Sequence, residues 1–167
     1  MDFSLTADQQ SIRESVERLC RGFDDGYWLK KDREGGFPHE FFDAMAASGW
    51  LGICIPEEYG GSGLGVTEAA IMAQAIAESG AGMSGASAVH INIFGLNPVV
   101  VVGTDEQKRR MLPPMAAGKV KSCFAVTEPN TGLNTTQLKT RAVRTGDRYV
   151  VDGQKVSIDN PQRALKL

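Results

Sequence analysis

The sequence predicts an α+β fold, with an N-terminal helical bundle followed by a partial antiparallel β-domain. Residues 1–118 contain Ala-rich and amphipathic stretches whose apolar residues recur at helical spacing. After Gly118, β-branched runs alternate with turn residues, a pattern typical of short antiparallel strands. We therefore predict a helical domain over 1–118 and a truncated β-domain over 119–167.

Composition narrows the class of protein. A chain of 167 residues with 42% hydrophobic and 23% charged residues is expected to form a packed core. The net charge of −2 and the lack of a basic, aromatic-rich stripe argue against a dedicated nucleic-acid binder. The most apolar run, 98–102, is far too short to span a bilayer, and the N-terminus lacks signal-peptide regions. We expect a cytoplasmic protein with no membrane partner.

Cysteine and histidine are too sparse for a metal site. Cys20, Cys54 and Cys123 are widely spaced and form neither a zinc pattern nor a disulfide framework, so reduced, mostly buried thiols are expected. His39 and His90 are the two histidines, and the carboxylates near them show no ligand spacing. No metal is expected, and His90 is interpreted as a hydrogen-bonded interior residue.

Four helices are predicted in the first part of the chain. The first follows a cap at Thr6 and runs to about Cys20; the second has Pro38 near its first turn. The third covers 66–79. The fourth, 83–97, is apolar around most of its circumference and is expected to be buried. The segments between helices are interpreted as a charged linker (27–34), a short extended piece (50–55) and an apolar connection (98–102).

A fifth helix and a short set of strands complete the prediction. Thr104 and Gln107 fit a capping box, and the helix that they open is expected to end near Pro113. Asp152-Gly153 is a strong hairpin signal. The strand candidates are 122–127, 139–144, 148–151 and 154–158, with a turn expected at Thr145-Gly146-Asp147 after the second of them. A sheet this small leaves unpaired edges, which favour pairing with another chain.

The most informative stretch runs from Cys123 to Asn134. There an apolar run ends abruptly in Thr-Glu-Pro-Asn-Thr-Gly. Pro129 lacks an N–H donor and disfavours a helical conformation at Glu128, while Gly132 permits a backbone conformation or close approach that a Cβ would obstruct. A strand that enters such a rigid polar loop suits a planar polar ligand or a phosphate, although the pattern alone also describes an ordinary turn.

Three ordered motifs resemble those of the acyl-CoA dehydrogenases, FAD enzymes that desaturate acyl thioesters. The motifs are Ala125–Pro129 with Gly132, Ile55–Gly61, and Gly103–Lys108. Their order and separations also match, and the similarity runs from about residue 3 to about residue 155. The resemblance implies FAD as cofactor, an acyl-CoA substrate, electron-transfer flavoprotein as a partner, a homo-oligomeric state and a role in fatty acid metabolism.

The resemblance also implies which residues contact the ligands. Val126 and Thr127 would offer backbone and hydroxyl hydrogen bonds to the isoalloxazine ring, and Gly132 would allow close backbone approach. Glu128 would shape the loop rather than act as a base. The implied cofactor-binding residues are Phe124, Ala125, Val126, Thr127, Gly132 and Leu133. The implied substrate-binding residues are His90, Phe94 and Leu133.

The sequence departs from the family pattern in two places. Leu133 and Asn134 replace the Ser or Thr and the Asp that usually follow the motif glycine. Ser157, Ile158 and Asp159 stand where the family has a flavin-contacting tryptophan and its neighbours. Losing a large aromatic contact weakens a flavin site. The family's catalytic glutamate belongs to a C-terminal bundle that this sequence lacks, so no catalytic residue is nominated.

Three interpretations remain open. The first is an acyl-CoA dehydrogenase-like flavoprotein for α,β-desaturation of an acyl-CoA thioester, C-terminally truncated and inactive as an isolated chain, with weak or no FAD binding. The second is a non-enzymatic helical oligomerisation or interaction module derived from that family. The third is a damaged gene product whose helical part still folds.

Overall fold

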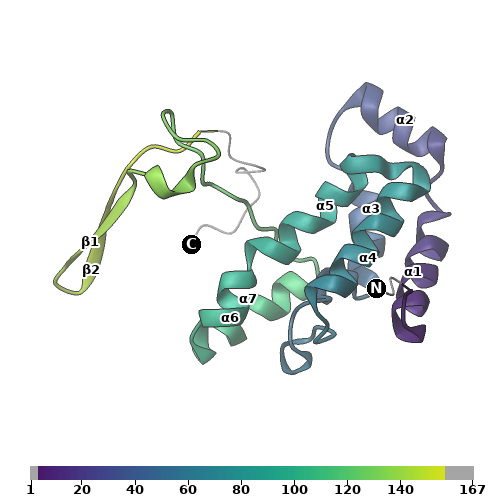
Figure 1. Cartoon of the computed structure of the whole chain (residues 1–167), viewed down its shortest axis with the longest axis horizontal. Coiled ribbons are helices and arrows are strands. Elements are labelled where there is room, and N and C mark those ends of the chain that lie inside the picture. Colours follow the sequence, from purple (N-terminus) through teal and green to yellow (C-terminus); the bar gives the residue numbers. More distant parts are fainter. Residues whose placement is uncertain (1–3, 157–167) are drawn as a thin grey trace. The chain divides into compact units, whose positions relative to one another are not determined.

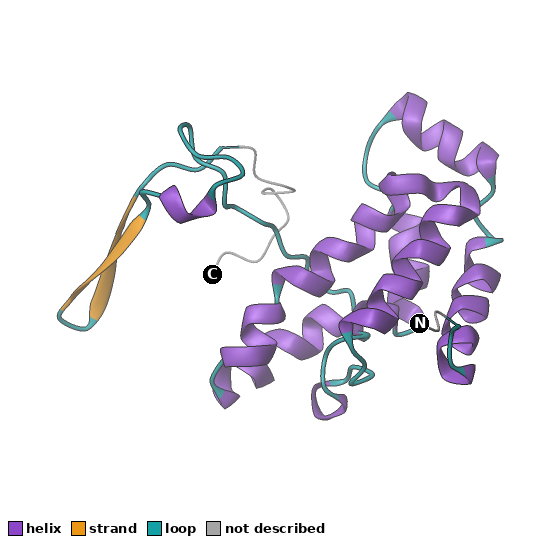
Figure 2. Cartoon of the chain, viewed as in Figure 1, coloured by secondary structure: helices purple, strands orange, loops and turns teal. Residues whose placement is uncertain are grey.

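The computed structural model describes residues 4–156, and the chain divides into two compact units, Met1–Ser122 and Cys123–Leu167 (Figure 1). Helices α1 to α7 belong to the first unit, and strands β1 and β2 belong to the second (Figure 2). Within the described residues these two strands form one antiparallel pair. The predicted α+β class is confirmed.

Helix α1 (Ala7–Cys20) begins at the predicted cap. The Thr6 hydroxyl accepts a hydrogen bond from the Gln9 N–H at 3.2 Å, and the Gln9 side chain accepts one from the Thr6 N–H at 3.1 Å. This reciprocal pair satisfies two backbone donors that a helix start otherwise leaves unpaired. Val16 and Cys20 then bury the inner face of the helix.

The segment predicted as a charged linker is helix α2 (Asp25–Glu34), so that prediction is wrong. The Asp24 carboxylate caps it by accepting from the Tyr27 N–H at 2.9 Å. Trp28 is its one buried residue and packs edge-on against Phe41, with ring centroids 5.1 Å apart. A helix that buries a single side chain shows almost no apolar periodicity, which is why the pattern did not reveal it.

Helix α3 (His39–Ala47) follows Pro38 as expected and buries Phe41, Phe42 and Met45. The predicted extended piece after it is wrong: the chain forms two 3₁₀ turns, η1 (Trp50–Gly52) and η2 (Glu57–Tyr59). Gly49, with φ 79°, turns the chain sharply, and its carbonyl accepts from the Gly52 N–H at 3.1 Å. Short i to i+3 hydrogen bonds of this kind favour a tight turn over a strand.

A long apolar segment follows as helix α4 (Val66–Ile76), the π-helical turn η3 (Ala77–Ala81) and helix α5 (Gly82–Gly95). Together with α6 it is the one described stretch, Val66–Val102, that is long and apolar enough to cross a membrane, by length and composition only. Its backbone is interrupted at Gly80, where φ is 97°. Four α4 residues belong to the apolar core: Ala69, Met72, Ala75 and Ile76.

Helix α5 is buried on one side only, so the predicted burial around most of its circumference is wrong. Gly85, Ala86 and Val89 are buried, whereas Met83 is 74% exposed and His90 is also exposed. Because nearly every side chain of this helix is apolar or small, its sequence carries little information about which side faces inward.

The last two helices of the unit are α6 (Asn97–Val102) and α7 (Asp105–Ala116). Residues 98–102 are therefore helical rather than a simple connection. The predicted capping box at Thr104 is confirmed, since its hydroxyl accepts from the Gln107 N–H at 3.3 Å. The helix ends at Ala116, two residues beyond the predicted end near Pro113-Pro114, and the Pro113 carbonyl accepts from the Ala117 N–H at 3.1 Å.

Two apolar clusters hold the first unit together. The larger one joins side chains of α1 to α5 around the ring of Phe41, which is fully buried. The smaller one joins α7 to Ile55 and Leu96. Burying a large apolar side chain contributes about 1.5–3 kcal/mol, so these clusters dominate the stability of the unit. The fully buried large side chains are Phe41, Phe42, Met45, Leu51, Ile53, Met72, Ile76, Leu112 and Met115.

The second unit contains fewer strands than predicted. A 3₁₀ turn, η4 (Thr135–Gln137), precedes the hairpin of β1 (Arg141–Thr145) and β2 (Arg148–Asp152). The hairpin turns at Gly146-Asp147, so the predicted turn at Thr145-Gly146-Asp147 is confirmed, whereas no second hairpin forms at Asp152-Gly153 within residues 4–156. The predicted strand 122–127 forms no ladder within residues 4–156, and 153–156 are not in a strand. The rest of the predicted strand 154–158 lies outside the described residues.

Candidate functional site

The Thr-Glu-Pro motif forms a tight antiparallel turn. The Glu128 N–H donates to the Thr131 carbonyl at 2.9 Å, and the Thr131 N–H donates back to the Glu128 carbonyl at 3.1 Å. Pro129 and Asn130 occupy the two central positions. Proline fixes the φ that a turn needs at its first central position, which explains why the chain reverses here. The rigid polar loop predicted from the sequence is therefore present.

The buried carboxylate of Glu128 organises the loop. It accepts hydrogen bonds from the backbone N–H groups of Lys139 at 2.7 Å and Thr140 at 2.9 Å, and from Lys155 Nζ at 3.0 Å. The neighbouring Thr140 hydroxyl, then the two amides and finally Lys155 lower the pKa of Glu128 to about 2. Within the described residues this buried hydroxyl makes no hydrogen bond of full geometry. Glu128 therefore shapes the loop, as the resemblance implies.

Lys155 and Val156 hold the strand-like segment that leads into this turn. Lys155 Nζ donates to the Val126 carbonyl at 2.8 Å, and the Val156 N–H donates to the Thr127 carbonyl at 2.9 Å. Both carbonyls are thus occupied within the loop. Among residues 4–156, the N–H groups of Val126 and Thr127 and the Thr127 hydroxyl donate to no other group of the chain. Within residues 4–156 these donors therefore have no partner that would compete with a ligand.

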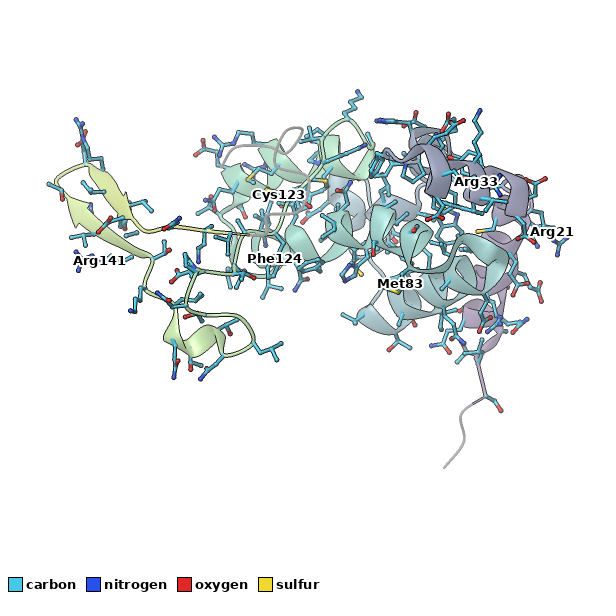
Figure 3. The ribbon with its side chains drawn as sticks, turned by 90° about the horizontal axis from the view of Figure 1, so that it is seen from above. Arg21, Arg33, Met83, Cys123, Phe124 and Arg141 are labelled. Carbon is cyan, nitrogen blue, oxygen red and sulfur yellow. The ribbon has the colours of Figure 1, made fainter. Side chains whose placement is uncertain are left out.

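The six implied cofactor residues are accessible to different degrees. Phe124, which is labelled in Figure 3, is 44% exposed by its accessible surface, and Leu133 is fully exposed. Ala125 and Gly132 are also exposed, whereas Val126 and Thr127 are half-buried. An exposed edge of apolar side chains beside free N–H donors suits a planar ring with a polar rim.

Gly132 meets only part of its predicted role. Its φ is not positive, so no left-handed conformation requires glycine there. A Cβ added to it would meet nothing within 4 Å in the described chain. The open space beside Gly132 is consistent with the close approach of a ligand, but no contact within the chain demands a glycine.

Two of the three implied substrate residues, His90 and Phe94, lie on helix α5 in the first unit, whereas Leu133 belongs to the second. The rings of His90 and Phe94 are stacked, with centroids 4.5 Å apart and an interplanar angle of 28°. This separation of four residues places both rings on one side of the helix. His90 is exposed, so its interpretation as an interior histidine is wrong. The polar residue that α5 buries instead is Asn92, whose side-chain oxygen accepts from the Ser122 N–H at 3.2 Å.

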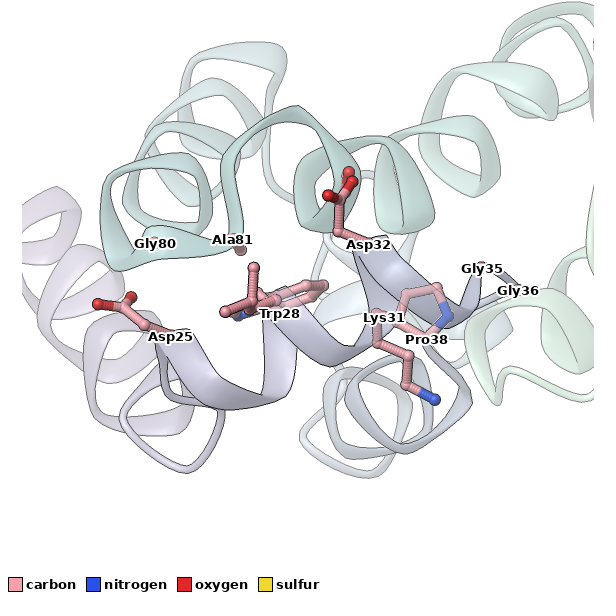
Figure 4. Close-up of a pocket in the computed structure, with 11 residues that line it drawn as sticks. Asp25, Trp28, Lys31, Asp32, Gly35, Gly36, Pro38, Gly80 and Ala81 are labelled. Atoms are coloured by element: carbon pink, nitrogen blue, oxygen red, sulfur yellow. The ribbon is translucent and has the colours of Figure 1, made fainter.

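A surface hollow of the first unit lies beside α2 and the bend at Gly80, where Asp25, Trp28 and Lys31 line it (Figure 4). None of the implied cofactor or substrate residues lines this hollow. Gly35 and Gly36 also line the hollow. The hollow is therefore a feature of the helical packing that is separate from the Thr-Glu-Pro loop.

Metal-binding groups do not gather in the described part of the chain. Over residues 4–156, no three or more His, Cys, Asp or Glu side chains come close enough to hold an ion.

The three cysteines are free thiols, and burial raises the pKa of Cys20 and of Cys54. The residues that replace the family's tryptophan, Ser157, Ile158 and Asp159, lie outside the described residues.

Lys155 and Thr140 belong to the site, although no local pattern in the sequence selects them. Lys155 lies at the end of the segment that resembles the family, and Thr140 lies within a strand candidate. The contacts that join them to Glu128 span 27 and 12 residues. A buried Glu in a turn motif, followed by Lys shortly after a strand pair, is the signal that could have suggested this pairing.

Comparison with known proteins identifies the family. The family model described as the acyl-CoA dehydrogenase N-terminal domain matches residues 6–119 of this chain. The chain belongs to the acyl-CoA dehydrogenase family. It is similar to the probable acyl-CoA dehydrogenase YngJ of Bacillus subtilis, with 36% identity over 98% of this chain and 43% of that protein.

Solved structures give the same result. One match, from a structure of the electron transferring flavoprotein of Acidaminococcus fermentans, has a TM-score of 0.81 and 33% identity over 98% of this chain and 43% of that chain. Another, the FAD complex of PigA, has a TM-score of 0.88 and 25% identity over 98% of this chain and 43% of that chain. This chain therefore spans less than half the length of the relatives that it matches.

Proposed function

We propose that this chain is the part of an acyl-CoA dehydrogenase-type oxidoreductase that forms one wall of its FAD site. The observation that carries the proposal is the Val126–Thr127 segment, whose carbonyls are occupied by Lys155 and Val156 while its N–H groups have no partner within residues 4–156. The loop therefore presents donors in a fixed orientation. Family membership and the likeness to an FAD complex support FAD as the ligand.

The chain's own residues would bind and orient the ring. The amides of Val126 and Thr127 and the Thr127 hydroxyl would donate to the polar rim of the isoalloxazine, and the open space at Gly132 would admit it. Phe124 and Leu133 would cover its apolar parts. A bound flavin supplies the capacity to accept a hydride, and the protein contributes binding, orientation and electrostatics.

The proposed reaction is α,β-desaturation of an acyl-CoA thioester, with His90 and Phe94 on the acyl side. Electron-transfer flavoprotein is the proposed electron acceptor, supported by the protein named in one matching structure. We further propose that these 167 residues do not catalyse the reaction alone. Glu128 is the one buried carboxylate within residues 4–156, and a group with its pKa lowered to about 2 is too weak a base to remove an α-proton.

The test is an absorbance spectrum of the purified chain between about 350 and 500 nm, the range in which flavins absorb, with and without acyl-CoA. We expect FAD to be lost during gel filtration and no acyl-CoA-dependent reduction of an electron-accepting dye. Stoichiometric flavin that survives gel filtration, or dye reduction above that of a heat-denatured control, would contradict the proposal.

The second candidate function, a non-enzymatic oligomerisation module, is favoured by one observation. All ten residues of β1 and β2 are exposed, which is unusual for a sheet with several apolar side chains. Stable association without flavin absorbance, even when FAD is added in excess, would favour this second function over the first.

A further inference from the structure

The hairpin leaves both of its outer edges open. Within residues 4–156, β1 and β2 pair only with each other, and every one of their residues is exposed. Val143 and Val150 are each 53% exposed, Tyr149 is 65% exposed and Val151 is 67% exposed. An isolated two-stranded hairpin is marginal in water, and an unpaired edge is a template for another strand. A third strand would stabilise this hairpin.

The register shows which backbone groups face outward. Thr145 and Arg148 flank the two-residue turn, and Val143 pairs with Val150. Pairs that exchange both hydrogen bonds alternate along an antiparallel ladder with pairs that exchange none, and the pair beside a two-residue turn is of the bonded kind. Tyr149 and Val151 therefore turn their N–H and C=O groups toward the free edge of β2.

The sequence of β2 is complementary to itself. It reads Arg-Tyr-Val-Val-Asp, from Arg148 to Asp152. When two such strands run antiparallel about Val150, Arg148 of each lies opposite Asp152 of the other, and Tyr149 lies opposite Val151. Opposite charges and aromatic–β-branched pairs are the favourable cross-strand combinations.

Strand β1 lacks this property. It reads Arg-Ala-Val-Arg-Thr, so the same antiparallel arrangement places Arg141 opposite Thr145 and Ala142 opposite Arg144. No opposite charges meet in this arrangement, and Arg141 and Arg144 of both copies place four positive charges along the junction. Charge complementarity therefore selects the edge of β2.

We propose that β2 pairs with β2 of a second copy of this chain, giving a four-stranded sheet in the order β1–β2–β2–β1 about a two-fold axis at Val150. Identical patches meet across such an axis, so the contact closes as a dimer. Val143 and Val150 of both copies form one continuous apolar row across the sheet. Asp152, 3.6 Å from Arg141 in its own hairpin, gains Arg148 of the second copy on its other side. This inference does not depend on flavin binding.

Proline substitutions test the edge. The Val151 N–H points outward, so Val151→Pro removes a donor to the second copy while the hairpin keeps its own hydrogen bonds. Ala142→Pro is the matched control, because Ala142 pairs with Val151 and its N–H points to the opposite edge. Sedimentation velocity from about 1 to 100 µM should show a dimer of the 18.0 kDa chain, weakened at least about tenfold by Val151→Pro and changed less than about twofold by Ala142→Pro.

Disulfide trapping provides a second, independent measurement. Directly opposed residues at a non-hydrogen-bonded position have Cα atoms about 4.5 Å apart, within reach of a disulfide. Val150→Cys should therefore cross-link two copies on mild oxidation, whereas Val143→Cys, one strand farther from the axis, should not. Contacts between positions 143 and 150 in nuclear Overhauser spectra show that the hairpin is intact in each variant.

Three outcomes would overturn the proposal. A chain that stays monomeric over the whole concentration range has no such dimer. A dimer that Ala142→Pro weakens and Val151→Pro does not uses the edge of β1. A dimer that neither proline affects, with no cross-link through Val150→Cys, has its interface elsewhere in the chain.

Discussion

Replacing Gly61 by alanine is expected to lower the free energy of unfolding of the first unit by about 3 kcal/mol or more. A Cβ at Gly61 would overlap the carbonyl oxygens of Ile55 and Gly52, and both are backbone atoms that cannot move as a side chain can. The loop around them is fixed by further bonds: the Ser62 N–H donates to the Gly52 carbonyl at 3.0 Å, and the Gly63 N–H donates to the Ile55 carbonyl at 2.8 Å. Urea denaturation followed by far-ultraviolet circular dichroism measures the loss.

The neighbouring glycine is the matched control. Gly60 has φ 84°, but a Cβ there would meet nothing within 4 Å. Gly60→Ala should therefore cost only the strain of a left-handed alanine, about 1–2 kcal/mol. Equal destabilisation by the two substitutions would contradict the tight packing of backbone against Gly61.

Replacing Glu128 by alanine should increase the local opening of the loop that contains Lys139 and Thr140 in the second unit. The amides of Lys139 and Thr140 and the Lys155 ammonium lose their shared acceptor, and hydrogen bonds to a charged group are the stronger kind. We expect exchange of the Lys139 and Thr140 amides to accelerate about tenfold or more, measured by NMR-detected hydrogen exchange. Glu128→Gln, which keeps one acceptor oxygen, should have a smaller effect.

Lowering the pH tests the same hydrogen bonds to Glu128 without a mutation. The pKa of Glu128 is lowered from 4.5 to about 2, so the folded loop favours the ionised form. The stabilisation is therefore complete above the unfolded value of 4.5 and is lost as the pH falls from there through about 2. The chemical shifts of the Lys139 and Thr140 amides should report this titration. A midpoint near the ordinary glutamate value would show that the carboxylate is not bound as described.

Local signals in the sequence were sufficient for the helix starts and for the family. Thr6 and Thr104 act through residues three positions away, and such short-range chemistry can be read directly from the chain. The Thr-Glu-Pro turn is equally local, because Pro129 alone restricts the backbone of two residues. These features depend on few contacts with the rest of the fold.

Features that depend on distant contacts could not be predicted in this way. Helix α2 (Asp25–Glu34) is held by Trp28 in the core, and no apolar periodicity records that contact. The sequence predicts turns at both Gly146-Asp147 and Asp152-Gly153, and only pairing along the whole strand shows that the first of them closes the hairpin. The partners of Glu128 are 11 to 27 residues away, so neither spacing nor propensity could identify them.

The most direct test of the flavin-site proposal is a titration of the isotopically labelled chain with FAD, followed by amide NMR spectra. We expect weak, fast-exchanging binding, with the largest shift changes at the amides of Val126, Thr127 and Leu133. Changes concentrated instead around the hollow beside Trp28, or no change at millimolar FAD, would contradict it.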